Sequence, residues 1–513
     1  MAIKTFAAID VGSFEMAMKI FEISAKCGMR EIDYIRHHLA LGSDTYNTKK
    51  IGYEKMDELC RILREFQQIM KTYGVTDYRA YGTSAIREAE NTLIILDQIR
   101  NRTGVEIQVL SNSEQRFLDY KSIASKGEEF RSFIGKGTAI VDIGGGTIQL
   151  SLFENDSLVT TQNVKIGVLR LHELLMQMRP KPGQQAAILD EMMDSQLSVF
   201  KKMYLKDRIV SNLIVMDDYI SGTIKGQLAE GKNGVVSKEV FGAFADSFFV
   251  KSREALAETY AVAEENVELM GISARILSHV MEMMNAETIW APGVTLCDGI
   301  AYEYAEKKRI NMTRHDFEKD IIACAKNISK RYMGSRKRSE VMEETALTIF
   351  DSMKKVHGMS KRERLLLQLA AIMHDCGKFI NMTDVGMCSY SIIMHTEMIG
   401  LSHREREIVA YVARFIHDDF SYYDEMAAAS DMNKETYLII AKLTAIIRIA
   451  NGLDKSHKQK FKKFKASLEE ERLILTVEGK QDIMYEQAIF RQRSDFFEEV
   501  FSIEPVIKQK KMD

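Results

Sequence analysis

The sequence predicts a duplicated α/β protein that continues into a helical region and a small α+β end. An apolar strand over 139–143 contains an aspartate, three glycines follow it, and then a second strand begins. The same order of strand, aspartate, glycine and strand opens the chain over 6–23. After residue 310 the pattern becomes mainly helical. Two similar hairpins, each opening an α/β segment, indicate an internal duplication with a cleft between the halves.

Composition and charge describe a chain of several domains with ample core. Its 513 residues are 46% hydrophobic and 28% charged, and the net charge is −3. A net charge this close to zero does not attract a polyanion by itself. Any anion site must therefore be a local basic patch. The chain has 4 prolines and 30 methionines, which favours a helix-rich protein.

The cysteines and the apolar segments favour a cytoplasmic protein. Six cysteines are scattered without a C-x-x-C pair, as in a reducing compartment. The first four residues run directly into a strand, so we expect no signal peptide. The most apolar long segment, 437–450, contains Lys442 and Arg448, which favours a buried helix over a membrane span.

The first α/β half is expected over 1–124. After the opening hairpin, a helix is predicted over 54–73 from apolar residues at helical spacing. Those residues are Met56, Leu59, Leu63, Phe66 and Met70. A strand beginning near residue 78 enters a Gly-Thr-Ser turn that starts a helix carrying Arg87, and a further strand is predicted over 105–110.

Two segments of this half have competing interpretations. The helix N-terminus with Arg87 suits an anion, although a capped helix with a surface arginine explains the same residues. Ser111 can cap the next helix, with Glu114 three residues on completing a capping box. That structural role for Glu114 competes with a catalytic one.

The glycine-rich hairpin is the strongest chemical signal. Its loop consists of Gly144, Gly145, Gly146 and Thr147. Consecutive glycines can take positive φ and leave no Cβ in the way, so their backbone N–H groups can close around a phosphate. Asp142 is placed to hold Mg²⁺ directly or through water. A plain β-hairpin with a glycine turn is the alternative.

The order of motifs resembles the exopolyphosphatase/guanosine pentaphosphate phosphatase family. The motifs are Asp-x-Gly-Ser, Thr-Ser-Ala-Ile-Arg-Glu-Ala-x-Asn, Val-Leu-Ser-x-x-Glu and Val-Asp-Ile-Gly-Gly-Gly-Thr. Later segments agree, among them Leu296-Cys297-Asp298-Gly299, so the resemblance covers nearly the whole chain. It implies two actin/Hsp70/sugar-kinase-like (ribonuclease H-like) halves, over 1–124 and 125–305. The two halves are followed by an all-α HD-like domain over 310–465 and by a small α+β C-terminal domain over 466–513.

The resemblance also implies an activity and its site. The family removes terminal phosphates from polyphosphate, or the 5′ γ-phosphate from pppGpp, with Mg²⁺. The implied phosphate contacts are Gly12, Ser13, Arg87, Gly144, Gly145, Gly146 and Thr147, and the implied metal contacts are Asp10 and Asp142. The implied partners are polyphosphate or guanosine penta- and tetraphosphate, in a homodimer without a membrane or a specific nucleic acid.

Departures from the family pattern put catalysis in question. Gln115, after Glu114, stands where the family has its catalytic base, and Gln149 replaces a second glutamate. Glutamine cannot accept a proton near neutral pH, and losing a general base costs roughly 10²–10⁴ in rate. Glu114 is the next candidate for the base, although it points about 100° away on a helix. In the first loop, Phe14-Glu15 replaces Asn-Ser.

Three hypotheses follow for the function. The first is a phosphoanhydride hydrolase, weak or re-wired, and the second is a non-catalytic relative that binds polyphosphate or (p)ppGpp. A kinase of the same superfamily is the third, which the helical C-terminus and the Thr-Ser-Ala-Ile-Arg motif disfavour.

The helical region carries part of an HD-type motif. His374 and Asp375 resemble the His-Asp pair, but Arg338 stands at the position of the upstream histidine, so a structural pair is favoured over a metal site. The alternative is a metal site in which His395, His417 or His457 supplies the missing ligands. Two basic groups are either solvated surface or a track for a polyanion. They are Lys455, Lys458, Lys460, Lys462, Lys463 and Lys465, and Lys330, Arg331, Arg336, Lys337 and Arg338.

Overall fold

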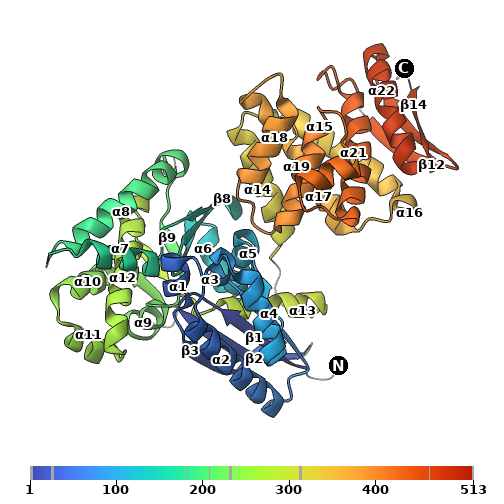
Figure 1. Ribbon diagram of the computed structural model, residues 1–513. Helices are drawn as coiled ribbons and strands as arrows, with labels where there is room; N and C mark the ends of the chain where they lie inside the picture. Colours follow the sequence, from blue (N-terminus) through green and yellow to red (C-terminus); the bar gives the residue numbers. More distant parts are fainter. Residues whose placement is uncertain are drawn as a thin grey trace. The chain divides into compact units, whose positions relative to one another are not determined.

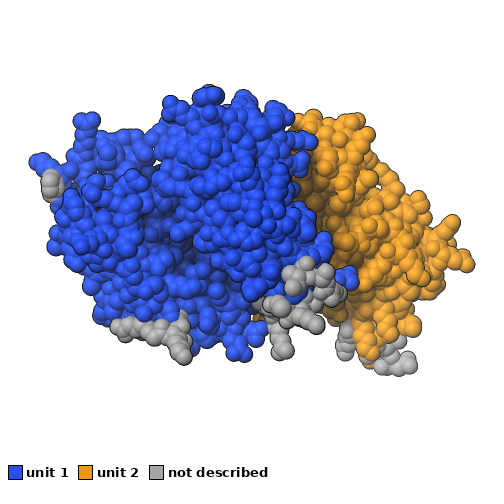
Figure 2. Space-filling view, turned by 90° about the horizontal axis from the view of Figure 1, so that it is seen from below, with its two compact units in different colours: residues 1–317 blue, residues 318–513 orange. Residues whose placement is uncertain are grey.

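The computed structural model describes residues 4–24, 28–181, 183–206, 208–229, 234–310, 315–461 and 463–510. Lys462 of the basic group lies outside the described residues. The chain forms two compact units, unit 1 over Met1–Phe317 and unit 2 over Glu318–Asp513 (Figures 1 and 2). Each unit has its own secondary structure and core.

The first half of unit 1 is a five-stranded sheet with the order β3-β2-β1-β4-β5. Strands β1–β3 form an antiparallel meander, and β4 and β5 add in parallel. The strands are β1 (Lys4–Val11), β2 (Glu15–Ser24), β3 (Gly28–His38), β4 (Asp77–Gly82) and β5 (Gln108–Val109). The helices are α1 (Leu41–Thr48), α2 (Tyr53–Thr72), α3 (Ser84–Glu88), α4 (Thr92–Thr103) and α5 (Asn112–Ala124).

Most predicted elements of this half are confirmed. Helix α2 buries the apolar face that its spacing predicts, and β4 turns into α3, which carries Arg87. The strand predicted over 105–110 is wrong in extent, because only Gln108 and Val109 pair with β4. Val105 and Ile107 are buried nonetheless, so apolar packing rather than strand pairing explains their pattern.

The second half repeats this arrangement in a six-stranded sheet, with the order β10-β11-β9-β6-β7-β8. Its meander β6–β8 and parallel strand β9 match β1–β3 and β4, which confirms the duplication at the level of topology. The strands are β6 (Thr138–Ile143), β7 (Ile148–Glu154), β8 (Ser157–Val164), β9 (Asn212–Asp217), β10 (Val235–Ser237) and β11 (Thr288–Trp290).

Among the helices of the second half, α12 (Val267–Met284) is long and buried, and α7 (Val168–Met178), α8 (Gln185–Phe200), α10 (Lys238–Val250) and α11 (Arg253–Tyr260) pack against it. The others are α6 (Glu128–Ile134), α9 (Ser221–Thr223) and α13 (Leu296–Lys307). Short π- and 3₁₀-helical turns are η1 (Lys201–Leu205), η2 (Ile224–Leu228) and η3 (Glu264–Asn266). Helix α13 returns to the first half and packs Leu296 and Ile300 against the β1–β2 face.

Unit 2 begins with a helical bundle and ends in a small sheet. The helices are α14 (Phe317–Arg331), α15 (Arg336–Ser352), α16 (Lys354–His357), α17 (Lys361–Met373), η4 (Cys376–Phe379), α18 (Val385–His395), α19 (His403–Arg414), α20 (Tyr423–Ala429) and α21 (Lys434–Leu453). The end consists of β12 (Lys463–Glu469), β13 (Arg472–Glu478), α22 (Met484–Phe501) and β14 (Glu504–Lys510), with the strand order β12-β13-β14.

Helix α21 is the apolar segment singled out in the sequence. It is long and apolar enough to cross a membrane, but 78% of its apolar window is buried inside the protein. The prediction of a buried helix is therefore confirmed.

Gly299 on helix α13 allows helix α5 to pack closely against α13, and α5 carries Gln115. A Cβ at Gly299 would lie 2.0 Å from the carbonyl oxygen of Leu118 on α5. We expect Gly299→Ala to destabilise unit 1 by roughly 2 kcal/mol or more, because backbone cannot yield as a side chain does. Thermal unfolding followed by circular dichroism measures the change.

Gly242→Ala is the matched control. Gly242 lies inside α10, and a Cβ there would meet no atom within 4 Å. This variant should be neutral or stabilised by about 0.5–1 kcal/mol, since alanine is the better helix former. Equal stability of the two variants would contradict the close packing of α5 on α13.

Candidate functional site

The two glycine hairpins close in the same way and meet each other. The N–H of Gly12 donates to the Glu15 carbonyl, and the N–H of Gly144 donates to the Thr147 carbonyl, each at 3.0 Å. A Cβ at Gly145 would lie 3.1 Å from the Ser13 Cβ. The first loop of one half therefore touches the second loop of the other, as a cleft between duplicated halves predicts.

The glycines are needed for close approach rather than for unusual backbone angles. Consecutive glycines permit positive φ and leave no Cβ in the way, and the loop uses the second property, because Gly144, Gly145 and Gly146 all lie outside the left-handed region. A Cβ at Gly146 would instead meet the Tyr46 ring, and one at Gly145 would meet Leu169. Larger residues are excluded by the neighbours of the loop.

Three hydroxyl groups gather between the loops. Ser13 Oγ lies 2.8 Å from Tyr46 Oη and 2.7 Å from Ser84 Oγ, and Tyr46 Oη lies 3.0 Å from Ser84 Oγ. We call Ser13, Tyr46 and Ser84 the hydroxyl cluster. Burial raises the pKa of Tyr46, so its hydroxyl stays protonated at neutral pH. Tyr46 is a residue that the sequence analysis missed, because its contacts come from three separate segments.

Each half contributes one arginine near the loops, Arg87 on α3 and Arg170, which also pairs with Glu88 at 3.0 Å. Arg87 Nη1 donates to the Leu110 carbonyl at 2.8 Å and to Gln115 Oε1 at 3.3 Å. The Arg170 guanidinium lies 4.8 Å from the Tyr46 ring centroid and donates from Nε to the Gly146 carbonyl at 3.0 Å. Arg170 was also missed, although a guanidinium beside a glycine loop is a common phosphate contact.

The start of helix α5 fixes the two residues at the expected base position. Glu114 Oε2 accepts from Ser111 N at 3.0 Å and from Ser111 Oγ at 2.6 Å, which confirms the capping box. Gln115, the next residue, contacts Arg87. Because the Glu114 carboxylate is engaged at its own helix cap, its catalytic role stays a prediction.

Carboxylates crowd the interior beneath the loops. They are Asp10, Glu15, Asp119, Asp142 and Asp217, and we call them the acidic cluster; Asp218 is next to them but is exposed to solvent. Burial, Glu15 and Asp142 raise the pKa of Asp10 to about 8, and burial and Asp217 raise the pKa of Asp142 to about 7. Burial raises the pKa of Asp217 to about 6, against hydrogen bonds from the start of α9. Buried carboxylates this close cannot all be ionised without a compensating cation.

The cluster residues come from equivalent places in the two sheets. Asp10 is the penultimate residue of β1, and Asp142 is the penultimate residue of β6. Gln149 lies directly across from Asp142 in the β6–β7 pair and is only 4% exposed. Asp119 faces them from α5, one turn beyond Gln115, and burial and Asp142 raise the pKa of Asp119 well above its ordinary value. Asp119 also escaped the sequence analysis, since no motif contains it.

The donor set suits a hard cation. Within the described chain, Asp10 Oδ1, Asp119 Oδ2 and Gln149 Oε1 are buried oxygen atoms without a hydrogen-bond partner. Oxygen donors of this kind are the preferred ligands of Mg²⁺. No three carboxylate, histidine or cysteine side chains of the described residues lie in coordinating positions. The residues therefore fit the ion by chemistry, and their side chains would have to move toward it.

The His-Asp pair of unit 2 holds a guanidinium. Arg338 Nε lies 3.1 Å from both His374 Nε2 and Asp375 Oδ2. Arg338 therefore occupies the ring nitrogen and the carboxylate that an HD-type metal would need. His417 Nε2 also lies 3.3 Å from Asp375 Oδ1, but no three histidine, cysteine, aspartate or glutamate side chains of the described residues are placed to hold a metal.

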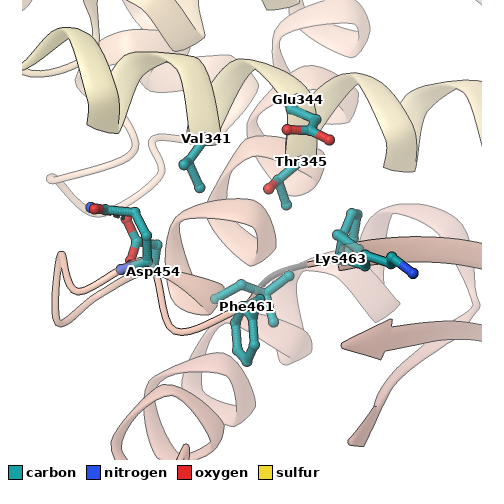
Figure 3. A pocket seen from close by; sticks show the side chains of 9 residues that line it. Val341, Glu344, Thr345, Asp454, Phe461 and Lys463 are labelled. Atoms are coloured by element: carbon teal, nitrogen blue, oxygen red, sulfur yellow. Dashed lines mark hydrogen bonds between the residues drawn. The ribbon is translucent and has the colours of Figure 1, made fainter. Parts of the chain in front are cut away.

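Unit 2 also holds a small cavity of about 70 Å³ near the start of its sheet. Figure 3 shows the side chains of Val341 and Thr345 pointing from α15 toward the segment with Asp454 and Phe461. Its charged lining is Glu344, Asp454 and Lys463, which gives it no net attraction for a phosphate.

Comparison with known proteins agrees with this arrangement. The duplicated sheets and the facing glycine hairpins define a two-lobed protein of the actin-like ATPase fold. An exopolyphosphatase structure from Cytophaga hutchinsonii superimposes with a TM-score of 0.52 at 17% identity, over 59% of this chain and 98% of its own.

The chain belongs to the Ppx/GppA phosphatase family, which matches residues 20–308, and the family's domain III matches residues 322–494. It is similar to a guanosine-5′-triphosphate,3′-diphosphate pyrophosphatase of Photobacterium profundum, 20% identical over 92% of this chain and 91% of that protein. It is also similar to exopolyphosphatase 1 of Mycobacterium tuberculosis, 25% identical over 37% of this chain and 54% of that protein.

The acidic cluster should make stability depend on pH. Asp10, Asp142 and Asp217 bind protons more tightly in the folded protein than their ordinary pKa of 3.8 allows. Their contribution is complete below about pH 4 and is lost as pH rises through about 6 to 8. Without divalent cations, the unfolding temperature of unit 1 should therefore fall between about pH 5 and 9.

Scanning calorimetry across this range tests the expectation. Asp10→Asn should flatten the decline, because the amide carries no charge to repel Glu15 or Asp142. Asp246→Asn is the control, since the Asp246 side chain is 74% exposed. An unfolding temperature that stays constant or rises over the range would contradict the clustering of the carboxylates.

Proposed function

We propose that the chain hydrolyses terminal phosphoanhydride bonds, of polyphosphate or of the 5′ end of pppGpp. The observation that carries this proposal is the meeting of both glycine loops, the Ser84 turn and two arginines above a buried acidic cluster. The names of the similar proteins, exopolyphosphatase and guanosine-5′-triphosphate,3′-diphosphate pyrophosphatase, support the same reaction class and leave the choice of substrate open.

The hydroxyl cluster marks where the terminal phosphoryl group would bind. The oxygens of Ser13, Tyr46 and Ser84 satisfy one another at 2.7–3.0 Å. A phosphoryl oxygen could replace any of these contacts, with Tyr46 moving aside. Arg87 and Arg170 would then stabilise the negative charge that spreads over the phosphoryl oxygens during transfer.

Asp10, Asp142 and Gln149 would hold the divalent cation through their carboxylate and amide oxygens. The cation, when bound, neutralises charge that develops on the phosphate oxygens. It would also relieve the repulsion that raises the pKa of Asp10. The chain therefore has a physical reason to bind a cation here.

Two side chains of helix α5, Gln115 and Asp119, would orient the attacking water and accept its proton. Gln115 can orient a water through its amide but cannot take its proton. Asp119 lies close enough to Asp142 to share a hydrogen bond, and it is not among the ligands proposed for the cation. Its carboxylate is therefore the candidate that could accept the proton of the water.

A non-catalytic phosphate-binding protein is the second candidate. Glu114 is held in its capping box, and Gln115 and Gln149 are neutral where the family resemblance implies carboxylates. These residues would lower the rate while leaving the phosphate contacts in place. A cytoplasmic homodimer belongs to the same proposal for either candidate.

Phosphate release by the purified chain with Mg²⁺ tests the hydrolase directly. Long-chain polyphosphate and pppGpp are offered separately, and Asp142→Asn should lower release from the preferred substrate by roughly 10²-fold or more. Asp246→Asn should release phosphate at the wild-type rate. Absence of release from both substrates, with binding retained, would favour the second candidate.

Restoring the lost carboxylate is the complementary test. Gln115→Glu together with Gln149→Glu should raise the rate of phosphate release by about 10²-fold, because a general base contributes roughly 10²–10⁴. Gln227→Glu, on an exposed turn, is the control. An unchanged or lower rate in the double variant would show that the proton goes to another group, such as Asp119.

A further inference from the structure

A group of apolar side chains lies exposed on the helical bundle of unit 2, and we call it the apolar patch. It consists of Met333, Phe379, Ile380, Met382 and Met387, whose exposed fractions range from 43% to 79%. Tyr332, next to Met333, contacts the Phe379 ring with the centroids 5.7 Å apart, which joins the loop after α14 to the segment between η4 and α18. Single exposed apolar residues are ordinary, but a contiguous group marks an interaction surface.

The segment between η4 and α18 is held in a fixed turn. The N–H groups of Ile380 and Asn381 both donate to the Gly377 carbonyl, at 2.9 and 3.1 Å. Asn381 Oδ1 accepts from the N–H of Thr383 at 2.7 Å and from the N–H of Asp384 at 3.3 Å. The turn thus satisfies its own polar groups while its apolar side chains remain exposed. A preformed turn loses little conformational entropy when those side chains bind elsewhere.

Positive charges border the apolar patch on both of its segments. Lys330, Arg336 and Lys337 lie within four residues of Met333 in the chain, and all three are exposed. Lys330 and Arg336 also line one cavity of about 300 Å³, so they are neighbours in space. Lys378 comes directly before the first apolar residue of the other segment. An exposed apolar surface is therefore combined with a basic border.

The carboxylates near the apolar patch are mostly neutralised. Glu340 Oε1 lies 2.7 Å from Arg336 Nε, and Asp375 Oδ2 lies 2.8 Å from Lys378 Nζ. Asp384 adds one exposed carboxylate on the apolar segment. Two further cations form no ion pair among the described residues, and they are Lys330 and Lys337. The border therefore carries more positive than negative charge.

We infer that the apolar patch and its basic border dock unit 2 on an anionic lipid bilayer. The apolar side chains would enter the boundary between headgroups and acyl chains, and the lysine amines would lie at the level of the headgroups. Binding of this kind combines buried apolar area with attraction to anionic lipid, and the surface supplies both.

The composition of the surface favours a lipid partner over a protein partner. Lysine is depleted in protein interfaces, whereas surfaces that bind membranes pair lysine with exposed apolar side chains. The family resemblance implies no membrane partner, so this docking surface adds to what the resemblance implies. The inference also goes beyond the hydrolysis proposed for unit 1 and does not require it.

Tryptophan fluorescence of the full-length protein gives a readout at the apolar patch. The chain has one tryptophan, Trp290, which is buried and stacks on Phe133 with the ring centroids 4.9 Å apart. In Phe379→Trp, vesicles containing phosphatidylglycerol should shift the new emission to the blue, and brominated acyl chains should quench it. Vesicles of phosphatidylcholine alone should do neither at an ionic strength of about 0.1 M.

A double variant tests insertion of the apolar side chains. Ile380→Gln with Met382→Gln, made in the reporter protein, should lower partitioning into the anionic vesicles about tenfold, because two apolar side chains no longer leave water. Leu93→Gln with Ile94→Gln is the matched control. Leu93 and Ile94 are comparably exposed apolar residues of α4, and their replacement should leave partitioning unchanged.

A single variant tests the basic border. Lys330→Gln should lower partitioning about fivefold, because each lysine near an anionic surface adds to the attraction. Lys71→Gln is the control, since Lys71 is exposed in the last turn of α2 as Lys330 is in the last turn of α14. Circular dichroism confirms folding of each variant.

The possible results are distinct. Emission that anionic vesicles leave unshifted overturns the inference, as does partitioning that Ile380→Gln with Met382→Gln leaves unchanged. A blue shift that appears without vesicles and grows with protein concentration would assign the apolar patch to a second copy of the chain and would also overturn it. Phosphate release by unit 1 does not enter this readout, so failure of the proposed function is distinguishable from failure of this surface.

Discussion

Repulsion between buried carboxylates is the constraint on which unit 1 depends. Asp10 and Asp142 occupy equivalent positions in duplicated sheets, so the same topology that builds the cleft also forces like charges together. The resulting rise in their pKa values is an energetic cost in the absence of a cation. A structural role does not explain such an arrangement, because apolar residues would fill the same space at lower cost. The proposed cation would bind these carboxylates together and remove the repulsion between them.

The loops above the cluster are closed by side chains of this particular chain. Phe14, which replaces a polar residue of the resembling family, is 6% exposed and packs against Tyr219, with ring centroids 4.5 Å apart. It joins the first hairpin to the core of the second half. Tyr46 fills the space beside Gly146. The substituted loop thus strengthens the contact between halves, and a phosphate would enter by displacing hydroxyl groups rather than by filling an open pocket.

The sequence predicts the parts of this protein that depend on local pattern. Hairpins, the helix α2 face and the Ser111 capping box follow from periodicity and capping chemistry, and the structure confirms them. Residues defined by long-range contact could not be found in this way. Tyr46, Asp119 and Arg170 gain their roles from segments far apart in the chain. The sequence allows two reasons for the triple glycine, positive φ and the absence of a Cβ, and only the neighbours of the loop, which are distant in sequence, show that the second applies.

Diffraction from crystals soaked in Mn²⁺ shows whether a cation joins the carboxylates of unit 1, because the anomalous signal of the ion locates it without reference to activity. The account predicts one strong peak in the cleft of unit 1, bounded by oxygens of Asp10, Asp142 and Gln149. Side chains of the acidic cluster should turn toward the ion. A cleft without a peak at saturating Mn²⁺ and pH above about 8, where the carboxylates are ionised, would contradict the account.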